Sequence, residues 1–222
     1  MSPSITRRSL LARMTGASAL LACGLLLSSA APAQETAAPV AAPEAADAPA
    51  MVGPQYAIKT TMGEIVVQLD QEKAPRTVAN FAAYAKSGFY NGTIFHRVID
   101  GFMIQAGGMN EKFEGRKTLK PVKNESSNGL SNQPYTIAMA REDNPDSATS
   151  QWFINVADNS GIDHPFVKGS GYTVFGKVVK GREVVDKIKG VVVDDVRGMQ
   201  NVPVVPIKIT NVTLLQRDKL VK

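Results

Sequence analysis

One arginine lies among apolar residues in the stretch FHRVIDGFMIQAGG, residues 95–108. Neighbouring side chains of a strand face opposite sides of the sheet, so Arg97 is expected to share a face with Phe95, and Gln105 with Met103. The pair Asp100-Gly101 between the two apolar segments is typical of a two-residue hairpin. Two strands should therefore lie side by side, and four outward side chains could meet across the turn: Arg97, Phe102, Met103 and Gln105.

The same stretch resembles the signature of the cyclophilins, peptidyl-prolyl cis-trans isomerases with the core F-H-R-[VI]-I-x-x-F-M-x-Q-[GA]-G. Three later segments resemble further blocks of that family in the same order: IAMAR at 137–141, SATSQWFIN at 147–155 and VFGKV at 174–178. The resemblance covers residues 56–214 and is nearest to the periplasmic cyclophilins of Gram-negative bacteria. It implies a monomeric isomerase without cofactor or metal, which acts on proline-containing unfolded or flexible polypeptides.

Residues 1–33 have the organisation of a secretory signal peptide. A basic start with three arginines precedes an apolar run at 19–27 and the A-x-A pattern Ala31-Pro32-Ala33. The apolar run is shorter than the ~20 residues that span a bilayer, so a removed signal is favoured over a stable membrane span. The sequence therefore predicts a periplasmic protein.

The export route stays open on the sequence alone. The segment TRRSLL at 6–11 resembles a twin-arginine signal, but an ordinary Sec signal also begins with basic residues. LLAC at 20–23 loosely resembles a lipoprotein cleavage box that would place a lipid on Cys23. Leu21 fits that box poorly, so cleavage after Ala33 is favoured.

The rest of the chain divides into three parts. Residues 34–54 are rich in Ala and Pro and read as a linker, residues 55–217 form the isomerase domain, and residues 218–222 are a tail. Cys23 is the only cysteine, so a chain cut after Ala33 can form no disulfide. Beyond residue 33 there are 22 basic and 20 acidic residues, a balance that gives no argument for nucleic-acid binding.

The domain pattern is dominated by short strands. Residues 56–60 and 64–69 predict an opening hairpin, and residues 207–215 a final strand. One helix is expected from Pro75 to a stop at Gly88, and a shorter one over residues 183–189. Many strands with only two helices favour a closed antiparallel β-barrel. The resemblance implies eight strands, a helix over each end, a filled interior and a substrate groove on the outside.

Arg97 is the catalytic residue that the resemblance implies. Amide resonance gives X-Pro rotation a barrier of about 18–20 kcal/mol, and the proline nitrogen can accept a hydrogen bond only when the bond is twisted. An arginine stays protonated and donates that bond mainly in the transition state. A lone arginine would otherwise read as a solvated strand residue.

The resemblance assigns the remaining groove positions by type. The apolar proline pocket falls on Phe102, Met103, Phe153 and Ile162. Two glutamines, Gln105 and Gln151, contact the substrate and the arginine. The bound peptide pairs with the backbone at Ala140 and Arg141, and His96 lies beside the arginine. The chain departs from the pattern of many eukaryotic members at Gly161, Tyr172 and Arg141, where that pattern has tryptophan, histidine and asparagine. Tyr172 is still expected to bind substrate, because it keeps an aromatic wall and a hydroxyl donor at the rim of the groove.

Alternation along the strands predicts which side of the sheet two pairs of neighbouring residues face. Phe102 and Met103 are adjacent, so only one is expected to face the groove unless the chain bends. Trp152 lies beside Phe153 and is expected to pack on the opposite side. The apolar groove residues could equally be core, the two glutamines ordinary surface amides, and His96 a structural histidine.

Other function classes fit less well. The two histidines, His96 and His164, are far apart and have no cysteine nearby, which argues against a metal hydrolase. A nucleophile-elbow motif is absent from the sequence, and no cysteine follows residue 33. Bulky alternating strands argue against a hollow ligand-carrying barrel. The serious alternative is a non-enzymatic periplasmic chaperone or peptide-binding module that uses the same groove.

Overall fold

The computed structural model describes residues 51–215. The predicted signal peptide, the Cys23 lipoprotein box, residues 34–50 of the linker and the C-terminal tail lie outside the described residues. Within them the chain opens with β1 (Gln55–Thr60), β2 (Gly63–Leu69) and α1 (Pro75–Lys86), close to the expected hairpin and first helix. Pro75 is suited to this helix start, where an amide hydrogen would have no helical acceptor.

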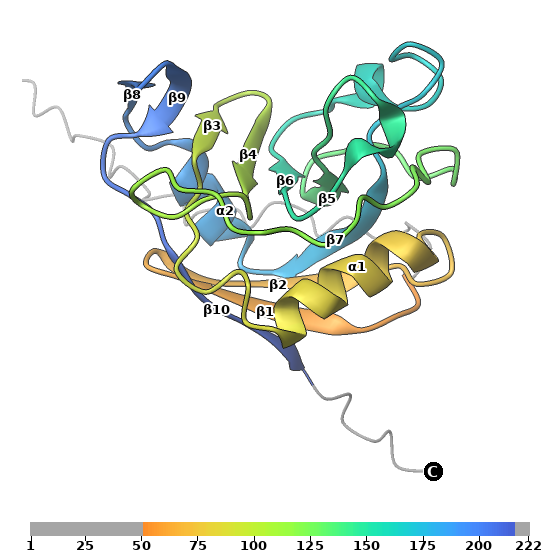
Figure 1. The fold of residues 1–222 in the computed structure, drawn as a ribbon, viewed down its shortest axis with the longest axis horizontal. Helices are drawn as coiled ribbons and strands as arrows, with labels where there is room; N and C mark the ends of the chain where they lie inside the picture. The colour runs from red at the N-terminus through yellow and green to blue at the C-terminus, as the bar shows by residue number, and fades with distance from the viewer. Residues whose placement is uncertain (1–50, 216–222) are drawn as a thin grey trace, which may run out of the picture. The chain divides into compact units, whose positions relative to one another are not determined.

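The remaining elements are mostly short strands. They are β3 (Arg97–Ile99), β4 (Met103–Ala106), β5 (Thr136–Met139), β6 (Trp152–Asn155), β7 (Val174–Lys180), α2 (Arg182–Lys189), β8 (Val193–Val196), β9 (Met199–Pro203) and β10 (Ile209–Leu215), with 3₁₀ turns at Pro145–Ser147 and Ser160–Ile162. Figure 1 shows α1 alongside β1 and β10. The second helix contacts β2, β3 and β4. The structure is mainly β with two helices, as expected.

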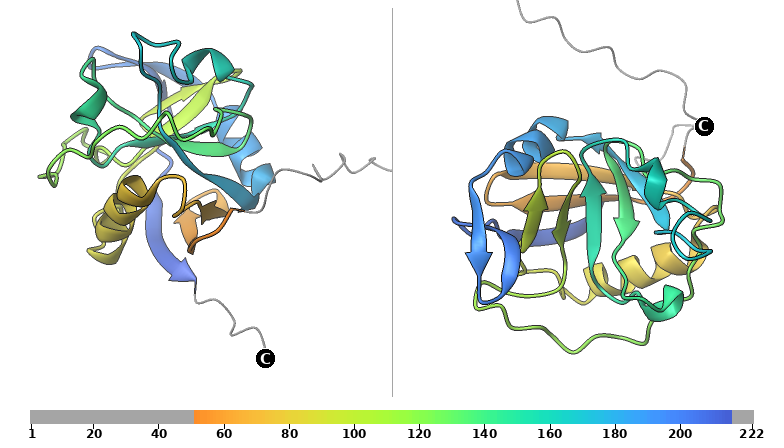
Figure 2. Two further views of the ribbon diagram at one scale, coloured as in Figure 1. Left: turned by 90° about the vertical axis from the view of Figure 1, so that its right-hand side faces the viewer. Right: turned by 90° about the horizontal axis from the view of Figure 1, so that it is seen from above.

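The eight-stranded sheet has the order β10-β1-β2-β7-β5-β6-β4-β3, and every pairing is antiparallel. The predicted closure is wrong, because the end strands β10 and β3 do not pair and the sheet is an open half-barrel (Figure 2). Contact between the two ends is limited to residues that precede β3: the Phe95 amide donates to the Ile207 carbonyl at 3.0 Å, and the amide of Ile209, the first residue of β10, donates to the Thr93 carbonyl at 2.8 Å. The three-residue β3 is too short to continue this contact, and β9 lies against it instead.

Aromatic side chains fill the inner side of the sheet. Trp152 is fully buried, with its ring centroid 5.8 Å from that of Phe95, 6.3 Å from Tyr90 and 6.4 Å from Phe81. Its neighbour Phe153 belongs to a separate apolar cluster, so the two residues occupy opposite sides of β6. The expected inward packing of Trp152 is confirmed.

The β3–β4 hairpin differs from its prediction in two ways. Arg97 pairs with Gln105 and Ile99 with Met103, so the loop contains three residues, Asp100 to Phe102, and not two. Gly101 has φ 74°, a left-handed conformation that is typical of three-residue hairpin loops. Phe95 does not share a face with Arg97, because it precedes the strand and packs against Trp152 while Arg97 is exposed.

Candidate active site

A row of side chains crosses five strands on the outer side of the sheet. Cross-strand pairs join Arg97 to Gln105, Gln105 to Phe153, Phe153 to Ala138, and Ala138 to Val174. Residues directly opposite each other in an antiparallel ladder project to the same side. With strands ~4.8 Å apart, Arg97 lies about 10 Å along the sheet from Phe153, with Gln105 between them.

Arg97 ends this row and is exposed to solvent. Within residues 51–215 its guanidinium makes no hydrogen bond or ion pair. It borders a cavity of about 310 Å³ together with His96 and three residues of the β8–β9 hairpin, Gly198, Met199 and Gln200. The arginine therefore presents donors to solvent beside a concave surface.

The floor of the site is an apolar cluster on the outer face. Met103 and Phe153 are almost fully buried, at 1% and 4% exposure, and pack with Ala138 and Val174. Half-buried side chains around them include four predicted groove residues: Phe102, Ala140, Ile162 and Tyr172. The apparent conflict between Phe102 and Met103 is resolved by the three-residue loop, because Phe102 precedes β4 and both side chains join this cluster.

The two glutamines meet in the structure. Gln105 Nε2 donates to Gln151 Oε1 at 2.9 Å, and both residues line a polar cavity of about 190 Å³ with Ala140, Arg141 and the loop at 142–149. In the described part of the chain, neither glutamine hydrogen-bonds to Arg97. Gln151 therefore holds the side-chain amide of Gln105, and Gln105 is the residue that pairs with Arg97 across the hairpin.

His96 is buried beside Arg97, with 6% of its surface exposed. Burial lowers the pKa of His96 below 6.5; the Ile94 backbone and Gln151 oppose this shift, and the Arg97 charge adds to it. The imidazole is thus held neutral in the folded state. This environment suits a residue that packs beside the arginine better than one that exchanges protons.

Sequence reasoning missed part of the floor. Ala138 and Val174 lie in the row with Phe153, and Ile99 and Leu130 pack against its edge. Alternation across β5 and β7 could have identified the first two. The hairpin residues 198–200 carried no local signal, because their position beside Arg97 depends on how β9 packs against β3.

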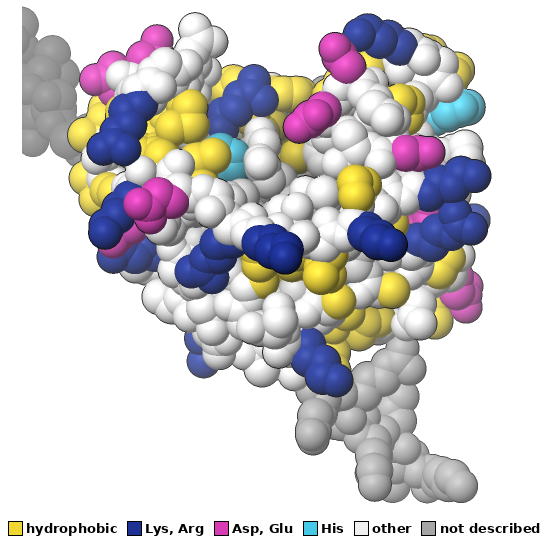
Figure 3. All heavy atoms as spheres, in the orientation of Figure 1, with side chains coloured by type: hydrophobic (Ala, Val, Ile, Leu, Met, Phe, Trp, Pro, Cys, Tyr) yellow, Lys and Arg dark blue, Asp and Glu magenta, His cyan; other side chains and the backbone are white. Residues whose placement is uncertain are grey.

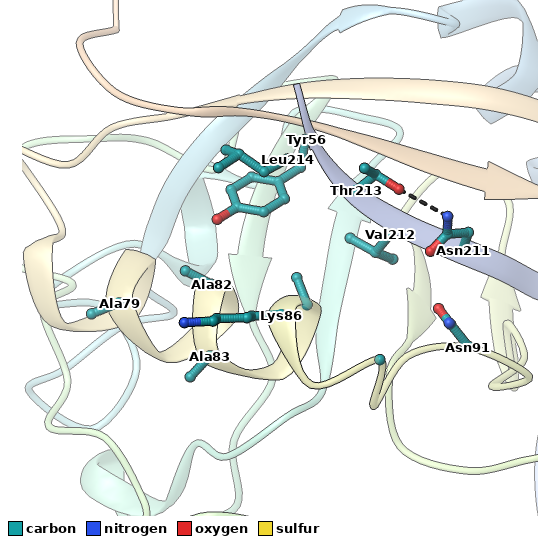
Figure 4. Close-up of a pocket in the computed structure, with 12 residues that line it drawn as sticks. Tyr56, Ala79, Ala82, Ala83, Lys86, Asn91, Asn211, Val212, Thr213 and Leu214 are labelled. Atoms are coloured by element: carbon teal, nitrogen blue, oxygen red, sulfur yellow. Dashed lines mark hydrogen bonds between the residues drawn. The ribbon is translucent and has the colours of Figure 1, made fainter. Parts of the chain in front are cut away.

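A larger cavity lies elsewhere. Its volume is about 930 Å³, and Figure 4 shows its lining residues on two elements, Lys86 and alanines on α1 and Val212 and Leu214 on β10. None of the predicted site residues lines it. The candidate site is therefore identified by its chemistry and cross-strand geometry, not by its size.

The described region has a surface of mixed charge. Figure 3 shows lysine and arginine side chains interspersed with acidic ones on the viewed face. Residues 51–215 contain no group of three or more His, Cys, Asp or Glu side chains placed to hold a metal ion. No helix in this region is long and apolar enough to cross a membrane.

Known proteins resemble this chain over nearly the whole described region. The family model for cyclophilin-type peptidyl-prolyl cis-trans isomerases matches residues 55–214. A peptidyl-prolyl cis-trans isomerase A of Dickeya dadantii is 53% identical over 160 residues, which cover 72% of this chain and 84% of the relative. The isomerase cyp18 of Streptomyces antibioticus is 51% identical over 160 residues, which cover 71% and 96%.

A solved structure gives the same assignment. The crystal structure of a cyclophilin-type isomerase of Cryptosporidium parvum, determined in the presence of the dipeptide Ala-Pro, superposes with a TM-score of 0.60 at 25% identity. The match covers 73% of this chain and 99% of the other. This chain belongs to the cyclophilin family and is a peptidyl-prolyl cis-trans isomerase.

Proposed function

We propose that Arg97 is the catalytic residue of this isomerase and that its substrates are proline-containing unfolded or flexible polypeptides. The observation that carries the proposal is an exposed arginine without a protein partner in the described residues, at the end of a row whose centre is the buried Phe153. The C. parvum structure was determined in the presence of the dipeptide Ala-Pro, which supports an X-Pro substrate.

The proposed chemistry stabilises the twisted amide. The proline ring packs on Phe153 and Met103, and the guanidinium of Arg97 donates a hydrogen bond to the proline nitrogen once that nitrogen has lost its resonance. A charge-assisted hydrogen bond contributes roughly 1.5–3 kcal/mol, which is about one to two powers of ten in rate. Anchoring of the ring and removal of the amide from bulk water supply the remainder.

Replacement of Arg97 tests the mechanism. Arg97→Ala is expected to lower kcat/KM for an Ala-Pro peptide by roughly 10- to 100-fold, because the transition-state donor is lost. Arg97→Lys keeps the charge without the planar fork and should recover only part of the rate. Nuclear magnetic resonance exchange measurements of the cis and trans peptide give both rates.

A surface control separates this effect from a loss of charge. Arg182→Ala removes an arginine that lies over Tyr135, away from the site, and should leave the rate unchanged. Wild-type activity in Arg97→Ala would rule out the proposed donor. A wild-type protein that binds the peptide without accelerating its isomerisation would favour the chaperone alternative.

We further propose that this isomerase acts as a monomer on exported proteins in the periplasm. The support is the signal-like organisation of residues 1–33, by the Sec or the twin-arginine route. Fractionation of producing cells should place the protein in the periplasm, and sequencing of its N-terminus should begin at Gln34. A mature N-terminus at a lipid-modified Cys23 would instead indicate anchoring to a membrane.

A further inference from the structure

Arg141 binds backbone carbonyls and an aromatic ring at the rim of the site. Its Nε donates to the Gly171 carbonyl at 3.1 Å, and its Nη1 donates to the Glu142 carbonyl at 2.8 Å. Its Cζ lies 4.8 Å from the centroid of the Tyr172 ring. The arginine therefore contacts both the backbone that precedes Tyr172 and the ring of Tyr172 itself.

Tyr172 transmits this contact to the floor of the site. Its ring centroid lies 5.7 Å from that of Phe153, at an interplanar angle of 74°. Edge-to-face pairs of this kind fix ring orientation as well as distance. Phe153 is the central residue of the cross-strand row, so Arg141, Tyr172 and Phe153 form a continuous stack from the rim to the floor.

The loop that carries Tyr172 has hydrogen bonds that do not involve Arg141. The Gly171 carbonyl also accepts a hydrogen bond from Asn124 Nδ2 at 3.0 Å, and the Tyr172 amide donates to the Ile162 carbonyl at 3.1 Å. The backbone around Tyr172 thus keeps partners without the guanidinium. The guanidinium also donates to the Glu142 and Asp143 carbonyls of its own loop, and at Tyr172 it supplies a cation over the ring, with its Nη2 buried and without a hydrogen-bond acceptor in the described residues.

We infer that Arg141 is a positioning residue that holds the Tyr172 ring against Phe153 and so forms the side wall of the proline site. The inference rests on the proposed function and extends it to substrate affinity. A fixed wall lowers the ordering cost when the proline ring binds, in the ground state and the transition state alike. Loss of Arg141 should therefore weaken peptide binding and leave the chemical step intact.

The test compares turnover and binding of an Ala-Pro tetrapeptide. Arg141→Ala should raise KM and the peptide Kd about threefold to tenfold, with kcat within about twofold of wild type, since cation–π contacts are modest. Arg141→Lys keeps a cation but not both backbone bonds, and its Kd should lie between the two. In a Tyr172→Ala background, Arg141→Ala should change Kd by less than about twofold, because the ring on which it acts is gone.

A matched control is present in the same chain. Arg116 lies 5.9 Å over the Phe89 ring and donates to the carbonyls of Phe89 and Asn91, away from the site. Arg116→Ala should leave KM and Kd unchanged while it affects thermal stability about as much as Arg141→Ala. An unchanged Kd in Arg141→Ala, or an equal effect with and without Tyr172, would overturn the inference. Failure of the Arg97 mechanism would be seen differently, as a normal kcat in Arg97→Ala.

Discussion

At the scale of single residues, His96 couples the site to pH. Its pKa is lowered in the folded state, chiefly by burial, so the unfolded chain binds the additional proton first as the pH falls through about 6.5. The stability that the neutral, buried imidazole contributes is present above that pH and is lost as the pH falls through the lowered folded-state pKa. The site should therefore be held most firmly at neutral and mildly alkaline pH.

Urea unfolding of wild type and His96→Asn between pH 8 and pH 5 measures this coupling. As the pH is lowered, the free energy of unfolding of wild type should decrease, by no more than about 1.4 kcal/mol per pH unit for one proton. The variant should show a smaller change in this free energy per pH unit. Asp143 and Asp158 have lowered pKa values, so they stay ionised over this range in both proteins. Identical slopes would show that His96 does not titrate on unfolding.

Site residues could be predicted from the sequence where they lie in a segment that resembles the family. Arg97, Gln105 and Phe153 fall in one cross-strand row; the resemblance had named all three as site residues, whereas alternation had brought together only Arg97 and Gln105 across the hairpin. The partner of Arg141 was not readable, because Tyr172 lies 31 positions later and the contact depends on two loops. The expected contact between Gln105 and Arg97 stays a prediction, because in the described structure the Gln105 side chain hydrogen-bonds to Gln151.

At the scale of elements, the first helix is capped from a distance. Ala74 precedes α1 and offers no side-chain acceptor. Glu125 takes that role: its Oε1 accepts from the Arg76 amide at 3.1 Å, and its Oε2 accepts from the Thr77 amide at 2.9 Å and from Thr77 Oγ1 at 2.8 Å. A carboxylate at a helix N-terminus satisfies free amides and interacts favourably with the helix dipole.

Removal of this cap should destabilise the domain. Glu125→Ala is expected to lower the free energy of unfolding by about 1–2 kcal/mol, in the range of other lost helix caps, and Glu125→Gln by less. Urea denaturation gives the values. Glu114→Ala removes a carboxylate that accepts from the Asn110 side chain on an exposed loop, and should change stability by less than about 0.5 kcal/mol. Equal effects of the two alanine variants would contradict the capping role.

Element boundaries show what local sequence can and cannot predict. Pro75 marked the start of α1, and Asp100-Gly101 marked the hairpin. The loop length was missed because a left-handed Gly101 fits a three-residue loop as well as a two-residue one. Glu125 gave no signal as a cap, since it lies 49 positions from the amide of Arg76 that it binds.

At the scale of the described domain, alternation predicted strands but not the closure of their sheet. Whether the two end strands then meet depends on the summed twist and on the length of β3, which has only three residues. The segment between α2 and β10 adds the separate β8–β9 hairpin, which contacts β3 on the Arg97 side.

The pairing of β1 with β10 has a consequence for biosynthesis. Gln55 pairs with Leu215 and Lys59 with Asn211, so the first strand of the described domain to leave the ribosome pairs with the last one described. One edge of β1 stays open until nearly the whole domain has been made, and this pairing is among the most non-local in the chain. A nascent chain can form the β1–β2 hairpin early, but the domain completes its sheet only after synthesis has reached residue 215.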